Sequence, residues 1–294
     1  MAVPQDMARP LLGIGLAVLA TVLFAAHDVV NKHLLASYDV PLVSAMRYLV
    51  HLMLMVAILG PVQGRQLVTT QRTGLVVVRA LCLVVATLFM GLALQLMPLA
   101  ETTAIIYLSP IMVVLLARPI LGEQIGLFGW IGAIGGFVGV LLIVRPGGGL
   151  DPLGVVFALC NVGVTVAYYL LSRILARSEK TLALLFYSAL AGAVCFGLLA
   201  PWYWFGTMPS ALDLLLFASL GVLAALGHYC FTAAYRHAPA SVLAPISYAH
   251  LLWAGVLGWI VFNQFPDAIG LAGMGLIGAA GVLVALHSSR RRKG

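Results

Sequence analysis

The sequence has 294 residues, of which 63% are hydrophobic and only 9% are charged. A typical soluble domain carries about 25% charged residues, so the composition argues against a soluble globular enzyme, a disordered chain and a secreted disulfide scaffold. The formal net charge of +7 raises nucleic acid as a partner, and the positions of the basic residues decide that question below.

Ten apolar stretches follow one another along the chain, and each is about long enough to cross a bilayer as a helix, which takes about 20 residues. They lie at 11–34, 41–62, 73–95, 99–121, 126–145, 152–176, 181–205, 212–235, 240–263 and 268–287. Because every backbone polar group must be hydrogen-bonded within such a segment in lipid, helices are expected rather than barrel strands. The sequence therefore predicts an all-α polytopic membrane protein with ten transmembrane helices.

Apart from Arg47 and Arg79, which lie inside spans, the lysines and arginines lie in termini and loops or near the ends of spans, and they fall almost entirely on one side of the predicted membrane. The other side has only Lys32 and Arg145, whereas the crowded side has Arg9, Arg65, Arg72, Arg118, Arg173, Arg177, Lys180, Arg236, Arg290, Arg291, Arg292 and Lys293. Short cytoplasmic loops retain positive charge, so both termini are expected to be cytoplasmic. The basic run 290–293 is interpreted as an anchor to anionic lipid, and nucleic acid is not expected as a partner.

The chain also resembles itself when it is shifted by 141 positions. The matched pairs include Lys32 with Arg173, Pro98 with Pro239, Tyr107 with Tyr248, and Gly132 with Gly273. The repeat divides the chain into a first half, 1–146, and a second half, 147–294, with five predicted spans in each. Since five is odd, the second half enters the membrane upside down, which is the architecture of many secondary transporters.

Particular motifs in both halves point to a known family. The first half contains Met97-Pro98-Leu99-Ala100, Ser109-Pro110, Leu121-Gly122-Glu123 and a glycine-spaced run from Gly129 to Gly139. The second half contains Ala244-Pro245-Ile246-Ser247-Tyr248, Leu252-Trp253-Ala254, Gly258-Trp259 and Phe262-Asn263-Gln264-Phe265-Pro266-Asp267. In these motifs the chain resembles EamA-type members of the drug/metabolite transporter superfamily over almost its whole length, and within them bacterial exporters of aromatic amino acids (YddG type).

The resemblance implies a ten-helix inverted repeat around a central cavity in the bacterial inner (plasma) membrane. The first, third, fourth, sixth, eighth and ninth helices would line that cavity. Relatives with this architecture are thought to carry amino acids, nucleotide-like metabolites, vitamins or drugs. The family often has Glu where this chain has Gln264, so the role of that acid does not transfer.

Ionisable residues inside a membrane span are costly, and each is a functional hypothesis by default. Asp28 and Lys32, four residues apart in the first span, either handle substrate or neutralise each other as a helical pair. Arg47 in the second span could reach Asp28 or be structural. Arg79 lies about 9 Å into the third span, where its guanidinium could bind a carboxylate bidentately. The alternatives for Arg79 are a pair with Glu123 and a reach to the inner surface.

Aromatic and hydroxyl side chains supply most other candidates, since a cavity for a compact apolar solute has aromatic walls and a few polar groups. Tyr107 and Tyr248 rank first because the repeat pairs them. The predicted substrate-binding set is Tyr107, Tyr248, Arg79, Thr103, Tyr168, His228, Trp253, His27 and Asp28. Ordinary packing is the alternative for each aromatic. His27 and His228 either serve proton-linked transport or are neutral hydrogen-bonded residues, and the histidines are not expected to bind metal.

Rows of small residues at helical spacing predict close helix packing. The fifth span carries Gly132 with Gly136 and Gly135 with Gly139, and the tenth carries Ala268, Ala272, Gly275 and Ala279. The alternative is a contact between two copies of the chain, so the protein is expected to be a monomer or a homodimer.

The leading hypothesis is a secondary transporter that exports small metabolites by alternating access, with amino acids, aromatic and other neutral ones, as the first choice of substrate. Uptake of a nucleobase, vitamin or other metabolite is the runner-up. A membrane-embedded enzyme or a channel is the alternative of another class. The sequence has no Walker loop, dinucleotide fingerprint, nucleophile elbow or zinc motif, so no ATP-driven pump, cofactor or metal is expected.

Overall fold

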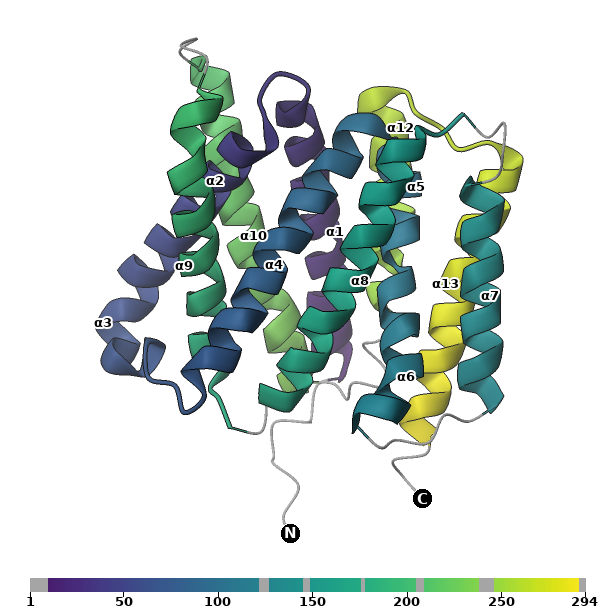
Figure 1. Cartoon of the computed structure of the whole chain (residues 1–294), viewed down its shortest axis with the longest axis horizontal. Helices are drawn as coiled ribbons and strands as arrows, with labels where there is room; N and C mark the ends of the chain where they lie inside the picture. The colour runs from purple at the N-terminus through teal and green to yellow at the C-terminus, as the bar shows by residue number, and fades with distance from the viewer. Residues whose placement is uncertain are drawn as a thin grey trace. The chain divides into compact units, whose positions relative to one another are not determined.

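The computed structural model of the protein describes residues 10–121, 127–144, 149–175, 178–204, 209–237 and 246–290. Over these residues the chain forms helices and their connections, with no strand (Figure 1). The helices of the first half are α1 (Pro10–Leu35), α2 (Val40–Leu54), η2 (Met55–Leu59), α3 (Gly60–Gln63), η3 (Gly64–Leu67), α4 (Thr73–Leu96), α5 (Leu99–Ile106), α6 (Leu108–Leu121) and α7 (Leu127–Val144). Those of the second half are α8 (Pro152–Leu175), α9 (Thr181–Leu199), η4 (Ala200–Tyr203), α10 (Ala211–His237), α12 (Ala249–Phe262) and α13 (Ala268–Arg290).

Many of these helices have the length and composition of membrane spans. Among the described residues, six runs are long and apolar enough to cross a membrane: Leu11–Leu35, Val40–Leu67, Thr73–Leu96, Pro152–Ser172, Thr181–Tyr203 and Ala211–Phe231. Four shorter apolar helices fall within the remaining predicted spans. The all-helical, multi-pass membrane architecture is therefore confirmed, and the total of ten crossings stays a prediction.

The second span is longer and less regular than the sequence predicted. The α-helical hydrogen bonding of α2 gives way to one π-helical turn, η2, and then to the short helices α3 and η3, so that the run extends from Val40 to Leu67. Pro61 sits at the start of α3. A proline has no N–H to donate to the preceding turn, which accounts for the change of helix type just before it.

The fourth and ninth predicted spans are each interrupted at a tyrosine. Tyr107 lies in a turn between α5 and α6, and Tyr248 lies in a turn directly before α12. Near the first break, Pro110 cannot donate to the carbonyl of Ile106, and the hydroxyl of Ser109 donates to that carbonyl at 2.7 Å. The two breaks occupy equivalent positions of the 141-residue repeat.

The contacts within the chain group it into two compact units. Unit 1 comprises Met1–Val29, Pro98–Leu150 and Leu226–Gly294, and unit 2 comprises Val30–Met97 and Asp151–Ala225. Each unit takes segments from both halves of the sequence. The packing units therefore differ from the sequence halves, and the boundary at 146/147 stays a prediction about the repeat.

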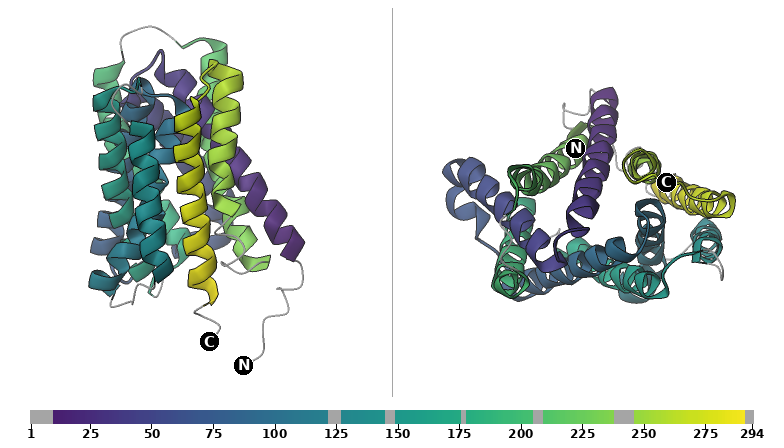
Figure 2. Two further views of the ribbon diagram at one scale, coloured as in Figure 1. Left: turned by 90° about the vertical axis from the view of Figure 1, so that its right-hand side faces the viewer. Right: turned by 90° about the horizontal axis from the view of Figure 1, so that it is seen from above.

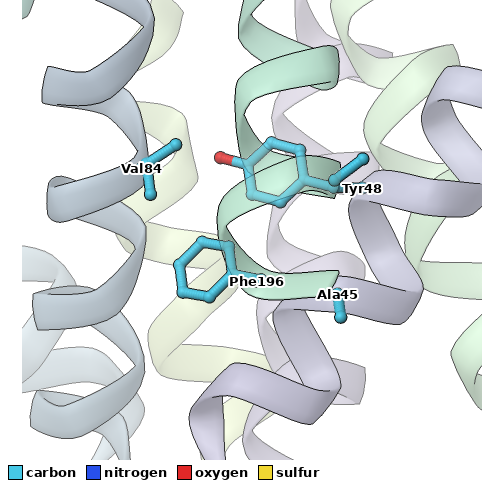
Figure 3. Packing of buried hydrophobic residues seen from close by; sticks show 5 residues of the cluster. Ala45, Tyr48, Val84 and Phe196 are labelled. Carbon is cyan, nitrogen blue, oxygen red and sulfur yellow. The ribbon is translucent and has the colours of Figure 1, made fainter. Parts of the chain in front are cut away.

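Unit 2 has a core in which α2, α4 and α9 meet. Figure 3 shows Tyr48 and Phe196 beside Val84, and the two rings stack with their centroids 5.9 Å apart and an angle of 10° between their planes. The hydroxyl of Tyr48 shares a hydrogen bond of 2.8 Å with the hydroxyl of Thr87 on α4. Gly192 on α9 leaves room for the Tyr48 ring, because a Cβ there would overlap it.

In unit 1, α7 and α13 approach closely through glycines. A Cβ added to Gly139 would lie 2.8 Å from the carbonyl oxygen of Gly273, and one added to Gly273 would lie 2.6 Å from the carbonyl oxygen of Gly139. Another face of α7 exposes Trp130, Ile134 and Phe137. Small residues at the helix contact and large apolar residues outside are what lipid as a solvent favours. Figure 2 shows α13 running alongside α12 as well.

The packing row predicted on the tenth span is wrong. The residues of that row are exposed: Ala268, Ala272, Gly275 and Ala279. The buried face of α13 carries Gly273, Ile277 and Ala280, and all three lie against the glycines of α7. The small residues occur on more than one face of this helix, so their spacing alone could not select the face that packs. The choice between monomer and homodimer stays a prediction.

Candidate functional site

The carboxylate of Asp28 is the centre of a buried polar cluster in unit 1. Nδ1 of His27 lies 3.0 Å from Oδ1 of Asp28, and Nε2 of His250 lies 3.2 Å from Oδ2. The three residues are only 7–9% exposed. His27 and Asp28 come from α1 and His250 from α12, so the cluster joins helices of the two sequence halves. Among the described residues no group of three His, Cys, Asp or Glu side chains has an arrangement that could hold a metal ion.

The two repeat-related tyrosines lie next to this cluster. The hydroxyl of Tyr107 donates to the backbone carbonyl of Ser247 at 3.0 Å, in the residue directly before Tyr248. The rings of Tyr107 and Tyr248 lie 5.3 Å apart, and the Tyr107 ring lies 5.7 Å from that of His250. The structure therefore brings together the pair that the repeat singled out, and their role toward substrate stays a prediction.

Gly281 on α13 fixes where the Tyr248 ring can lie. A Cβ at this position would overlap ring carbons and the hydroxyl of Tyr248, and Tyr248 is only 8% exposed. Because protein interiors are close-packed, any side chain at position 281 would have to displace the tyrosine.

Two further predicted residues carry buried polar atoms that have no hydrogen-bond partner among the described residues, the hydroxyl of Thr103 and the indole nitrogen of Trp253. Thr103 lies one helical turn before Tyr107, and Trp253 lies three residues after His250, so each shares a helix face with a member of the site. A buried donor without a partner costs about 1–3 kcal/mol. These donors suit the carboxylate or carbonyl oxygen of a bound solute.

His228 has a different setting in unit 1. It is exposed on α10, and its ring lies against Phe24 of α1 at 5.1 Å in an edge-on arrangement. This contact suits aromatic packing of α10 on α1, and the two roles that the sequence leaves open for His228, proton-linked transport and neutral hydrogen bonding, stay predictions.

Unit 2 contains the second group of predicted residues, centred on Arg79 of α4. Its guanidinium makes four hydrogen bonds to α8 and α9: Nε to the Ser172 hydroxyl at 2.6 Å, Nη1 to the Leu184 carbonyl at 3.1 Å and the Ser188 hydroxyl at 3.0 Å, and Nη2 to the Tyr168 hydroxyl at 2.7 Å. It also lies 4.4 Å from the centre of the Tyr168 ring.

The charge of this guanidinium has only neutral partners in these hydrogen bonds. Arg79 is 5% exposed, and an arginine has five N–H donors, of which the four bonds use four. Arg79 therefore links α4 to α8 and α9, and these hydrogen bonds offset the free-energy cost of burying its charge. Glu123, the partner considered from the sequence, lies outside the described residues, as does Pro245.

The other two basic residues considered inside or next to spans have local partners in unit 2. The ammonium of Lys32 donates to the carbonyls of Leu94 and Met97 at 2.7 and 2.6 Å, at the end of α4, where the helix dipole favours a cation. Arg47 donates to the hydroxyl of Thr87 at 3.0 Å, so it has a structural role in joining α2 to α4.

Sequence reasoning missed several members of these groups. Neither His250 nor the serines that bind Arg79, Ser172 and Ser188, are among the residues predicted from the sequence. Asn161, whose side-chain amide donates to the Ala86 carbonyl at 2.6 Å, was also missed. The only signal available was that each is a polar residue in an apolar span, which in lipid demands a partner.

Comparison with known proteins gives a family match to both halves of the chain. The model of the EamA-like transporter family matches residues 11–145 and again residues 152–286. A crystal structure superimposes with a TM-score of 0.68 at 23% sequence identity, covering 97% of this chain and 98% of the other.

Three relatives with similar sequences are all named as transporters, but their names give different substrates and directions of transport or none. An uncharacterized transporter of Helicobacter pylori (strain ATCC 700392 / 26695) is 32% identical over 64% of this chain, which spans 65% of that protein's length. An S-adenosylmethionine uptake transporter of Rickettsia bellii (strain RML369-C) is 27% identical over 90% of each chain. The pseudopaline exporter CntI of Pseudomonas aeruginosa (strain UCBPP-PA14) is 28% identical over 67% of this chain and 68% of its own.

Proposed function

Because the chain belongs to the EamA-like transporter family, we propose that it is a secondary transporter of the bacterial inner membrane that exports amino acids, aromatic and other neutral ones, by alternating access. The observation that carries the choice of substrate is the buried Asp28 cluster beside two tyrosine rings 5.3 Å apart and two buried donors that have no hydrogen-bond partner among the described residues. A charged group at this depth requires a counterpart, and an amino acid offers a positive and a negative end together with a side chain.

Each end of an amino acid has a counterpart among the described residues of unit 1. The ammonium group would bind the carboxylate of Asp28, and the carboxylate would accept from the Thr103 hydroxyl and the Trp253 indole. The side chain would lie against the rings of Tyr107 and Tyr248, which accept aromatic and aliphatic shapes alike. Few charges hold the ligand, and a broad specificity follows.

The sequence predicts Arg79 as the group that binds the substrate carboxylate, but most of its hydrogen-bond donors have partners within the protein. Four of its donors are already bonded within unit 2. We therefore propose that Arg79 and Tyr168 mainly hold the helices together. The remaining N–H donor of Arg79 makes it a secondary candidate for binding the substrate carboxylate.

A second candidate is uptake, and the Rickettsia bellii relative favours it. That protein is named an S-adenosylmethionine uptake transporter and aligns over 90% of both chains. S-adenosylmethionine carries an amino acid group and a cationic sulfur, so the Asp28 cluster could serve it in the same way. A nucleobase and riboflavin, which represent the runner-up substrates, carry no ammonium group.

The test is counterflow in proteoliposomes with labelled phenylalanine, threonine, S-adenosylmethionine, a nucleobase and riboflavin. Exchange of phenylalanine and threonine, lost in Asp28→Asn and Tyr107→Ala, is the expected result. Tyr229→Ala is the matched control, because Tyr229 is 71% exposed on α10 and should exchange as the wild type does. Exchange of the nucleobase or riboflavin without any amino acid would overturn the proposal, and exchange of S-adenosylmethionine alone would establish the second candidate.

A further inference from the structure

A small cavity lies in unit 2 at the connection between α1 and α2. It is lined by the segment 37–39 of that connection and by Tyr203 and Trp204, which follow α9. Its volume is about 60 Å³, several times the roughly 10–15 Å³ that one water molecule needs. The cavity therefore has room for one small polar group.

The lining of this cavity favours a cation. Three aromatic side chains, Tyr38, Tyr203 and Trp204, line it, and aromatic rings attract cations through their faces, tryptophan most strongly. The described residues that line it include no lysine, arginine or histidine. A positively charged group would therefore meet attraction here without competition from a basic side chain of the lining.

Asp39 supplies a negative charge at the same place. This residue also lines the cavity and is half-buried, and it precedes α2 at the N-cap position without making a side-chain cap hydrogen bond. No other hydrogen bond or ion pair of its carboxylate occurs among the described residues. A carboxylate with free acceptor capacity binds the N–H groups of a primary ammonium. A trimethylammonium group has no N–H to donate, so the carboxylate distinguishes the two kinds of cation.

Hydrogen bonds between two connections hold the cavity in shape. The hydroxyl of Tyr38 donates to Oδ2 of Asp213 at 2.9 Å, and the Tyr38 ring lies 5.1 Å from the ring of Phe217. The same Oδ2 accepts from the backbone N–H of Ser210 at 3.0 Å and from its hydroxyl at 2.7 Å. The protein thus uses the Asp213 carboxylate to fix an aromatic wall, and Asp39 is the carboxylate available to a ligand.

Exposed aromatic residues beside the cavity indicate its depth in the membrane. Trp202 is 75% exposed, and Tyr203 and Trp204 are 39% and 42% exposed. They lie at the end of the apolar run Thr181–Tyr203. Tryptophan and tyrosine are enriched where a membrane protein meets the lipid headgroups. A ligand that reaches this cavity therefore comes from the headgroup layer.

We propose that the cavity binds the ammonium group of a phosphatidylethanolamine headgroup, held by the Asp39 carboxylate and the rings of Tyr38, Tyr203 and Trp204. This headgroup is zwitterionic, so its phosphate comes with the ammonium, and the bound site keeps the net charge of −1 that Asp39 has alone. Because Asp39 is only half-buried, that charge stays in contact with water, and the phosphate remains in the hydrated headgroup layer. The site shares no residue with the Asp28 cluster, so it does not depend on the proposed function.

The experiment measures which lipid stays with the protein. Wild-type protein is reconstituted in nanodiscs of equal parts phosphatidylethanolamine and phosphatidylcholine and then extracted in mild detergent, and native mass spectrometry counts the lipids retained. We expect phosphatidylethanolamine to exceed phosphatidylcholine by about tenfold, since a hydrogen bond to a charged group provides a ratio of that order. Equal retention of the two lipids would overturn the proposal.

Two variants assign the lipid to the cavity. In Asp39→Asn the ratio should fall to about twofold, because a neutral amide oxygen is the weaker acceptor. Asparagine is as well suited to an N-cap as aspartate, so this variant should fold. Trp204→Leu should lower the number of phosphatidylethanolamine molecules retained by about threefold. An unchanged ratio in Asp39→Asn would contradict the site.

Trp202→Leu is the matched control, because Trp202 is exposed two residues before Trp204 and is not among the lining residues. It should retain lipid as the wild type does, and a loss equal to that of Trp204→Leu would reduce the site to a general effect of interfacial aromatic residues. Ethanolamine at millimolar concentration distinguishes the lipid from a free ammonium solute. We expect the lipid to stay bound, and its displacement by ethanolamine would overturn the lipid as the occupant.

Discussion

Single residues in this protein reveal their roles through the partners that offset their cost in lipid. Asp28 has two imidazoles, Lys32 has two carbonyls at a helix end, and Arg79 has four neutral acceptors. The sequence identified all three as costly, because a charge within an apolar run is visible from composition alone. It could not supply the partners, since His250 is 222 positions from Asp28 and only tertiary packing brings them together.

Replacing Arg79 by lysine should destabilise the protein by about 2 kcal/mol. The ammonium keeps the charge, but its three donors on one nitrogen cannot reach acceptors on both α8 and α9 as the planar guanidinium does. Thermal unfolding in detergent, followed by tryptophan fluorescence, measures the change. Arg47→Lys is the matched control, because the hydrogen bond that Arg47 makes among the described residues, to the hydroxyl of Thr87, is one that a lysine can also make. Equal shifts in both variants would show that the cross-link does not stabilise the protein.

At the scale of elements, the 141-residue repeat also relates two hydrogen bonds that hold helix ends in unit 2. The hydroxyl of Tyr38, in the connection after α1, donates to Asp213 in the first turn of α10 at 2.9 Å. In the second half, Glu179 accepts from the backbone N–H groups of Gln71 and Arg72, just before α4. Positions 38 and 179 differ by 141, as do 72 and 213. The repeat register thus contained these ties, although the sequence alone marked them only as connections.

The tie at Tyr38 should weaken in alkali. Burial and the hydrogen bond to the Asp213 carboxylate raise the pKa of Tyr38 above its usual value of 10.0. A raised pKa in the folded state means that the contribution to stability is complete below pH 10 and is lost as the pH rises toward the folded-state pKa. The unfolding midpoint of the wild type should therefore fall between about pH 9 and pH 11 more than that of Tyr38→Phe, which has no group to ionise. Parallel curves for the two proteins would contradict this.

The breaks in the fourth and ninth spans are elements that the predicted spans did not include. Each of these spans contains a proline, Pro110 and Pro245, but the turns centre on Tyr107 and Tyr248. The first is explained by the missing N–H of Pro110, and the hydroxyl of Ser109 compensates for it. A serine directly before a proline in a span is a pattern from which this side-chain hydrogen bond could have been predicted.

Adding one methyl group at Gly281 should disturb the second break. Gly281→Ala places a Cβ where the Tyr248 ring lies, and overpacking of this kind costs about 1–3 kcal/mol. Gly275→Ala on the same helix is the control, because a Cβ there meets nothing within 4 Å and removal of a helical glycine stabilises by up to about 1 kcal/mol. The melting temperature should fall in the first variant and hold or rise in the second. Amino acid counterflow should also fall only in Gly281→Ala, and a loss in both would contradict a specific role for Tyr248.

At the scale of the whole molecule, composition and hydropathy were sufficient to predict the all-helical membrane class. The family followed from motifs and matches both halves, at 11–145 and 152–286. What could not be predicted is how the helices group, because helix packing in lipid depends on which face of each helix carries small residues. The tenth span shows this, since its buried face is Gly273, Ile277 and Ala280 rather than the row chosen from spacing.

The orientation of the chain gives a prediction at this scale. The twelve basic residues on one side of the spans should keep that side in the cytoplasm. Reporter domains that are active only in the cytoplasm should therefore work when fused to either terminus and fail in the loop at 37–39. A working reporter in that loop and a silent one at either end would contradict the orientation.

The mixed make-up of the two compact units has a consequence for how the gene can be rearranged. Severing the reading frame at 146/147 leaves each product with helices whose packing partners are encoded on the other piece. Neither fragment contains a complete hydrophobic core, so we expect each to fold stably only when both are synthesised together.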